Sequence, residues 1–167
     1  MRLTSRIFRY ILLAVIALAV IYTGYYAWTG HKAWAVMYDD ALGQSLGPAE
    51  SDLVLVEIMD YRCVHCRELK PVLERVQAAY PDLKIVIKHI PTSEAVALLE
   101  ARLALAAAKI GKFEEMHNFL LEQEEPPSDA DLAKMLAANG IDQESFIEIA
   151  KSDEVTDAIV GVFPAVA

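Results

Sequence analysis

A Cys-x-x-Cys motif at the junction of a strand-like and a helix-like segment constrains this chain more than any other feature. Cys63 and Cys66 are the only cysteines of the 167 residues. They follow residues 53–59, a nearly continuous apolar run with the β-branched content of a buried strand. Two intervening residues let both sulfurs meet in the first turn of a helix, so a disulfide can open and close there. The motif predicts a redox-active pair.

The position of the two cysteines predicts their separate roles. At the start of a helix the backbone N–H groups are unpaired and the positive end of the helix dipole faces outward, which favours a thiolate on Cys63. His65 lies between the cysteines and can add positive charge or a hydrogen bond. We therefore predict thiol–disulfide exchange, with Cys63 as the attacking sulfur, Cys66 as the resolving sulfur and His65 assisting.

Two other uses of the motif are weaker. A structural zinc site needs four ligands, but there is no second Cys-x-x-Cys and the four histidines lack the H-x3–5-H spacing. A structural disulfide across so short a loop would constrain the unfolded chain very little. Copper or zinc handling by Cys63, Cys66 and His65 stays as an alternative. The predicted exchange needs no cofactor and no metal.

The N-terminus predicts a membrane anchor. Residues 10–28 carry no charge, and their length approaches the roughly 20 residues that span a bilayer as a helix. Three arginines precede this run, Arg2, Arg6 and Arg9, and the positive-inside rule keeps them in the cytoplasm. Aromatic residues cluster at the far end of the run: Tyr22, Tyr25, Tyr26 and Trp28. We expect a cytoplasmic stub and signal anchor in residues 1–30, single-pass in the inner membrane, with the rest of the chain in the periplasm.

A cleavable signal peptide is the alternative to an anchor. Residues 33–35, Ala-Trp-Ala, have the small-residue pattern of a cleavage site, but the apolar run before them is longer than the usual ~7–15 residues. Both interpretations place the rest of the chain in an oxidising compartment, where disulfides persist. The net charge of −9 makes this exported part acidic. The sequence has no basic stripe with interleaved aromatic residues, the pattern that would indicate nucleic-acid binding.

The order of the remaining segments predicts an α/β domain. Residues 31–52 form a linker with turn residues, parts of which can make a short strand. A helix from Cys63 to Tyr80, interrupted by Pro71, has a stripe that we expect to be buried: Leu69, Leu73, Val76 and Tyr80. Residues 83–90 alternate like a strand, so the unit is βαβ with parallel strands. The cysteines then lie at the carboxyl end of the first strand, where open α/β sheets place their sites.

The second half of the chain is predicted to be helical. Thr92 or Ser93 can cap a helix that ends at Ile110–Gly111, and further helices cover residues around 113–120, 132–136 and 146–149. Ser128 and Asp142 are the expected caps of the last two, and His117 is expected to be a packing or capping histidine. Glu57 has two interpretations: a carboxylate in water at a strand end or edge, or a buried acid near the disulfide that helps to move protons.

Residues 56–71 resemble the active-site segment of the DsbA-like branch of the thioredoxin superfamily, and the resemblance continues through residues 89–91, 111–117 and 139–142. It implies a thioredoxin-like α/β fold over residues 53–167, with an inserted helical subdomain at about 92–159. It also implies a periplasmic protein-disulfide oxidoreductase with Cys63 as nucleophile, Cys66 as resolving cysteine and Pro71 as a helix kink. His65 stands where the oxidising members also carry histidine.

The resemblance changes near the C-terminus. The family continues into a cis-proline loop, two more strands and a final helix, whereas this sequence ends at Ala167. Pro164, after Gly161-Val162, is either a shortened version of that loop or part of an unrelated tail. We therefore expect a C-terminally shortened domain.

The expected function is a membrane-anchored periplasmic oxidoreductase that transfers the Cys63–Cys66 disulfide to dithiols of exported proteins. Its expected partners are those substrates and a membrane redox protein that reoxidises or reduces the cysteine pair. Two alternatives stay open: a reductase or isomerase of the same fold, and a non-catalytic anchored binding module left by loss of the C-terminal strands.

Overall fold

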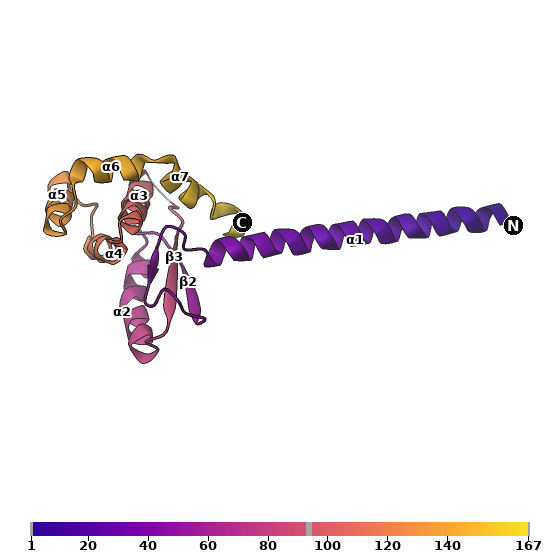
Figure 1. Ribbon diagram of the computed structural model, residues 1–167, viewed down its shortest axis with the longest axis horizontal. Helices are drawn as coiled ribbons and strands as arrows, with labels where there is room; N and C mark the ends of the chain where they lie inside the picture. The colour runs from indigo at the N-terminus through magenta and orange to yellow at the C-terminus, as the bar shows by residue number, and fades with distance from the viewer. Residues whose placement is uncertain (1, 93–94, 167) are drawn as a thin grey trace. The chain divides into compact units, whose positions relative to one another are not determined.

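The computed structural model describes residues 2–92 and 95–166, and it divides into two compact units, Met1–Ala35 and Val36–Ala167. The first unit consists of most of helix α1 (Arg2–Tyr38), labelled in Figure 1. Residues Ile7–Tyr38 are long and apolar enough to cross a membrane. The predicted long apolar helix at the N-terminus is therefore confirmed, and it continues through the first residues of the predicted linker.

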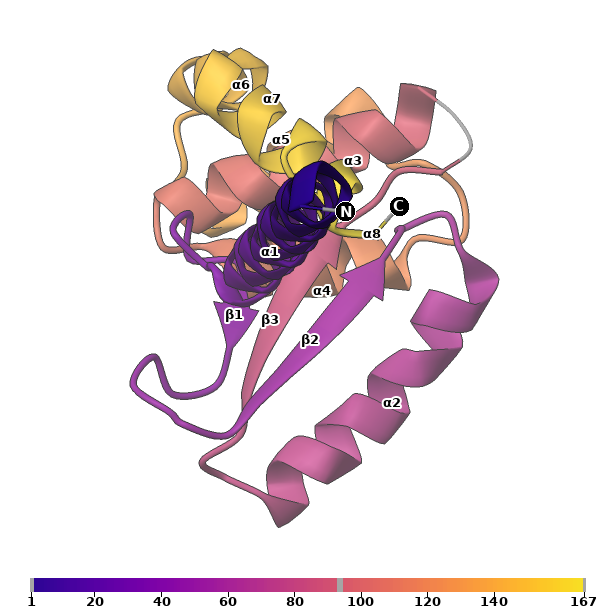
Figure 2. The same ribbon diagram turned by 90° about the vertical axis from the view of Figure 1, so that its right-hand side faces the viewer.

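The second unit contains a three-stranded sheet with the order β1-β3-β2. β2 (Val54–Met59) and β3 (Lys84–His89) are parallel, whereas β1 (Ser45–Leu46) pairs antiparallel with β3. The register places Glu57 beside Ile87 and Met59 beside His89. Figure 2 shows β3 between its two neighbours and α2 running along β2. The parallel pair confirms the predicted βαβ unit, and β1 lies within the segment predicted as a linker.

Helix α2 (Val64–Ala79) connects the parallel strands and contains Pro71. Its residues Leu73 and Val76 pack against the main core, which includes Ile85 and Ile87 of β3. The predicted buried stripe is wrong in extent, because no residue of α2 is fully buried: Leu73 and Val76 are half-buried, and Leu69 and Tyr80 are exposed.

The remaining helices follow β3 and gather at the end of the sheet toward which the β2 and β3 arrows point in Figure 2. They are α3 (Ala95–Lys109), α4 (Phe113–Glu122), α5 (Asp129–Ala138), α6 (Gln143–Lys151), α7 (Asp153–Val160) and α8 (Phe163–Val166). α3 is rich in alanine and is the most buried of them, packing on α4, α6 and α7. The helical insertion is confirmed, and it places α3 and α4 beside the cysteine-containing end of the sheet.

Most of the predicted helix ends are also present. The side chain of Ser128 accepts a hydrogen bond from the Asp131 N–H, and that of Asp142 accepts one from the Ser145 N–H, so both act as N-caps. Gly111 follows α3 with φ +69°, a backbone conformation that glycine adopts without strain. Thr92 instead bonds to Asp60, and Ser93 lies outside the described residues.

The C-terminal segment differs from the suggested loop. Pro164 lies within the short helix α8, and no peptide bond is cis in the described parts of the chain. Pro164 therefore does not adopt the conformation of a cis-proline loop, and the helical turn around it accounts for the difference.

Candidate active site

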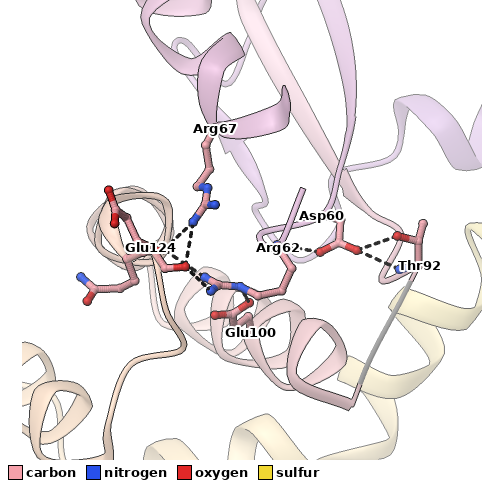
Figure 3. Close-up of polar contacts among 7 residues, drawn as sticks. Asp60, Arg62, Arg67, Thr92, Glu100 and Glu124 are labelled. Atoms are coloured by element: carbon pink, nitrogen blue, oxygen red, sulfur yellow. Dashed lines mark hydrogen bonds and ion pairs between the residues drawn. The ribbon is translucent and has the colours of Figure 1, made fainter. Parts of the chain in front are cut away.

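The turn that leads into the cysteines is held by Asp60. This residue is 6% exposed, and its two carboxylate oxygens are both used. Oδ1 accepts a hydrogen bond from the Arg62 N–H at 2.8 Å, and Oδ2 accepts from the N–H and hydroxyl of Thr92, each at 2.9 Å. Figure 3 shows Asp60 facing Thr92. One carboxylate thus ties the end of β2 to the segment after β3 and fixes the position of Cys63.

Cys63 occupies the N-cap position of α2 in an extended conformation, with φ −78° and ψ 115°. No side chain caps the helix there, so its first N–H groups are free to face the sulfur. The N–H of Cys66 is the main cause that lowers the pKa of the Cys63 thiol, followed by the Cys66 thiol itself. The predicted stabilisation of the Cys63 thiolate therefore has a specific origin in the first helical turn.

Cys66 has the opposite electrostatic environment. It packs against the main core, and burial is the largest cause that raises the pKa of its thiol. Both cysteines are free thiols in the structure. The pair is therefore asymmetric, with one sulfur that favours the charged form and one that favours the neutral form.

His65 is placed differently from the sequence-based expectation. Its side chain is 86% exposed, and Nδ1 lies 3.2 Å from Oε2 of Glu68 on the solvent side of α2. The backbone N–H of His65, rather than its ring, contributes to lowering the pKa of Cys63. The ring is available to a molecule that approaches from solvent.

Two arginines flank the motif and bind the helical insertion. Arg62 donates through Nε to Glu100 Oε2 at 2.8 Å, and through its other nitrogens to the carbonyl oxygens of Gln123 and Glu124. Arg67 donates to the same two carbonyls, at 2.7 and 3.3 Å. Figure 3 shows both guanidinium groups converging on the segment that follows α4. The residues before Cys63 and after Cys66 are thereby attached to α3 and to the end of α4.

Glu57 is buried rather than exposed to water. It is 8% exposed on β2, and burial raises the pKa of its carboxyl to about 7. It lines a cavity of about 90 Å³ together with Cys66, Lys70 and His117. The interpretation of Glu57 as a buried acid near the cysteines is therefore the one that the structure supports.

A buried aromatic cluster adjoins this cavity. The Tyr61 hydroxyl oxygen lies 3.0 Å from His117 Nδ1 and 3.2 Å from His89 Nε2. The ring of His117 stacks on Phe113, with the centroids 5.3 Å apart. Packing was the expected role of His117, and it is confirmed, but the hydrogen bond to Tyr61 was not foreseen.

Metal binding has little support in the described residues. Across residues 2–92 and 95–166 no group of three or more His, Cys, Asp or Glu side chains is arranged to hold a metal ion. The ring of His65 points to solvent and pairs with Glu68. The described residues thus offer no cluster for the zinc or copper alternative.

Comparison with known proteins was consistent with this geometry. The model of a family described as the DSBA-like thioredoxin domain matches residues 54–161. A thioredoxin-like oxidoreductase from Silicibacter pomeroyi superposes with a TM-score of 0.69 at 26% identity, over 77% of this chain and 75% of that one. A periplasmic thioredoxin-like protein from Salmonella enterica superposes with a TM-score of 0.58 at 26% identity, over 78% of each chain.

One curated relative is a much larger protein. The Na(+)/H(+) antiporter NhaA 3 of Salinispora tropica is 31% identical over 104 residues, which cover 61% of this chain and 16% of that antiporter. The chain therefore spans about one sixth of the length of the curated relatives that it matches first.

Proposed function

This chain belongs to the DSBA-like thioredoxin family of thiol–disulfide oxidoreductases, and on this premise we propose that it transfers the Cys63–Cys66 disulfide to dithiols of exported proteins. The observation that carries the proposal is the asymmetry of the two thiols, in which the pKa of Cys63 is lowered and that of Cys66 is raised. A stabilised Cys63 thiolate favours the reduced form of the pair, so the disulfide is an oxidant. Members of this family are themselves among the known examples of a strongly lowered cysteine pKa.

The exchange begins at the more accessible sulfur. A substrate thiolate attacks Cys63 Sγ, the Cys63–Cys66 bond breaks, and Cys66 leaves as a thiolate. The second substrate thiolate then attacks the substrate sulfur of the mixed disulfide, and Cys63 leaves as a thiolate. Two electrons pass from the substrate dithiol to the cysteine pair, and the substrate gains a disulfide.

Glu57 provides the proton that Cys66 needs. The Glu57 carboxyl and the Cys66 thiol line the same cavity, and a carboxyl with a pKa of about 7 is partly protonated near neutral pH. In the oxidising direction Glu57 donates a proton to the departing Cys66 thiolate. The substrate dithiol loses two protons. One of them reprotonates the Glu57 carboxylate, and the other passes to solvent because Cys63 stays ionised.

The proposed location is the periplasmic side of the inner membrane. Helix α1 is long and apolar enough to serve as an anchor, and one structural neighbour is described as periplasmic. An oxidising compartment would keep the cysteine pair available as a disulfide. A membrane redox protein that reoxidises the pair would complete the cycle.

The test is the equilibrium of the full-length protein, in detergent, with reduced and oxidised glutathione. We expect a reduction potential above thioredoxin's value of about −270 mV. Cys63→Ser should abolish exchange, whereas Cys66→Ser should accumulate mixed disulfides with substrate. A potential well below that of thioredoxin would point to a reductase, and a Cys63→Ser protein that retains full oxidase activity would overturn the proposed mechanism.

A further inference from the structure

Three buried side chains form a hydrogen-bonded row that ends at the cavity beside Cys66. His89 Nε2 lies 3.2 Å from the Tyr61 hydroxyl oxygen, which lies 3.0 Å from His117 Nδ1. The three residues are 3%, 1% and 4% exposed. The mechanism above uses none of them, although Tyr61 precedes the nucleophile by only two residues.

The hydroxyl has one proton, so the row has two possible directions. In one, His89 Nε2–H donates to Tyr61 and Tyr61 donates to His117 Nδ1, which leaves His117 protonated on Nε2. In the other, His117 Nδ1–H donates to Tyr61, and Tyr61 donates to His89 Nε2. The second direction would place the proton of His89 on Nδ1, which is buried and has no partner among the described residues. A buried N–H without an acceptor is rarer than a buried acceptor without a donor, so the first direction is favoured.

Both imidazoles are neutral in the folded protein. Burial lowers the pKa of His89 to about 3 and that of His117 to about 4. The only remaining donor of His117 is then Nε2–H. In the described residues this nitrogen has no hydrogen-bond partner, and it is not among the fully enclosed atoms. His117 lines the same cavity as Cys66 and Glu57, and Nε2–H is the one donor that its ring has left to offer there.

We propose that His117 is a positioning residue that donates its Nε2–H into this cavity and stabilises the Cys66 thiolate. The space open to the centres of water molecules in this cavity is about 90 Å³, more than the roughly 10–15 Å³ that one water needs, and water bound there would pass the hydrogen bond from the ring to the sulfur. Tyr61 fixes the ring so that its donor points outward rather than into the core. His117 thereby makes Cys66 a better leaving group when the disulfide opens.

The surrounding charges make such a donor useful. Besides Cys66 and His117 themselves, the titratable and charged groups that line the cavity are Glu57 on β2, Lys70 and Glu74 on α2, and Glu114 on α4. Three of these four are acidic, and Glu57 contributes to raising the pKa of Cys66. A neutral N–H donor stabilises a thiolate without adding a charge that would have to be buried.

The inference rests on the proposed function, and its test measures Cys66 separately. In the full-length protein with Cys63→Ser, the rate of Cys66 alkylation as a function of pH gives the pKa of this thiol. His117→Leu should raise that pKa by about one unit, the size expected for loss of one hydrogen bond to a charged group. His117→Gln should restore most of the shift, because its side-chain amide can place an N–H near the position of Nε2.

Tyr61→Phe keeps the size of the side chain but removes the hydroxyl, so it should give an intermediate rise. Asn118→Leu is the matched control, because Asn118 lies on the same helix and lines the same cavity without belonging to the row. An unchanged pKa of Cys66 in His117→Leu would overturn the inference. If His117→Leu does not fold, an unchanged pKa in Tyr61→Phe would overturn it. Failure of the wild-type disulfide to exchange with glutathione would instead refute the proposed function.

Discussion

Arg62 Nε lies 2.8 Å from Oε2 of Glu100, which joins the residue before the nucleophilic cysteine to helix α3 of the insertion. The Glu100 side chain is 1% exposed and that of Arg62 14%, so this ion pair is largely removed from water. Burial raises the pKa of Glu100, and the adjacent Arg62 guanidinium opposes that rise. This ion pair therefore joins the active-site turn to the insertion, and removing either partner would leave the other one buried without its counter-charge.

Arg62→Ala should destabilise the protein by about 3 kcal/mol, because it leaves the Glu100 carboxylate buried without its partner. It also removes the hydrogen bonds to the carbonyl oxygens of Gln123 and Glu124. Urea unfolding of the full-length protein measures the change. Arg75→Ala is the matched control, because Arg75 is exposed on α2, and it should change stability by less than about 0.5 kcal/mol. Equal effects of the two substitutions would contradict the anchoring role given to Arg62.

Asp60→Asn should destabilise the turn before Cys63 by about 2 kcal/mol. The neutral amide has one acceptor oxygen in place of two, and its NH2 group would face either the Arg62 N–H or the two donors of Thr92. The exposed Asp82 serves as the control, because its side chain makes none of these contacts. The comparison is made by urea unfolding, and an Asp60→Asn protein as stable as Asp82→Asn would contradict the role given to the carboxylate.

The sequence predicted those features that depend on neighbours along the chain. The apolar run of β2, the alternation of β3 and the caps Ser128 and Asp142 are local patterns, and the structure confirms them. The two cysteines were placed at the start of a helix because their spacing and the preceding strand are also local. Local patterns of this kind are sufficient to predict the fold class and the thiol–disulfide chemistry of the cysteine pair.

Contacts between distant residues could not be predicted in the same way. Arg62 and Glu100 are 38 positions apart, and Tyr61 and His117 are 56 apart. One sequence contains no signal that pairs one arginine with one of many carboxylates. The burial of Glu57 is a similar case, because a strand gives only the alternation of faces and not what covers each face. These contacts depend on how the insertion packs against the sheet.

The two cysteines should differ in their reaction with iodoacetamide. In the reduced full-length protein, Cys63 should be alkylated severalfold faster than Cys66 at neutral pH, because the thiolate is the reactive form and the pKa of Cys63 is the lower one. Mass spectrometry of peptides sampled over time identifies each site. Faster alkylation of Cys66 would contradict the assignment of nucleophile and resolving cysteine, and the denatured protein gives the reference in which the rates should be similar.

Glu57 should make the folded state less stable as the pH rises through the weakly acidic range. Its pKa is about 7 in the folded protein and near the ordinary value of 4.5 in the unfolded chain, so the folded state binds the proton more tightly. The contribution to stability is then fully present below about pH 4.5 and is lost as the pH rises toward 7. Glu57→Gln removes this dependence, since its side chain does not titrate.

The measurement is the difference in unfolding free energy between wild type and Glu57→Gln at several pH values from 4.5 to 7.5, a range that brackets the pKa of about 7. We expect this difference to change by on the order of 2 kcal/mol, less than the full shift would give because the cavity is reached by solvent. Protonation of His89 and His117 acts in the opposite direction, because their pKa values are lowered, but it is common to both proteins and cancels in the difference. Glu125→Gln, in the exposed loop after α4, should give a difference that does not vary in this way. A flat difference for Glu57→Gln would mean that folding does not raise the pKa of this carboxyl, which would then be ionised near neutral pH and could not supply the proton to Cys66.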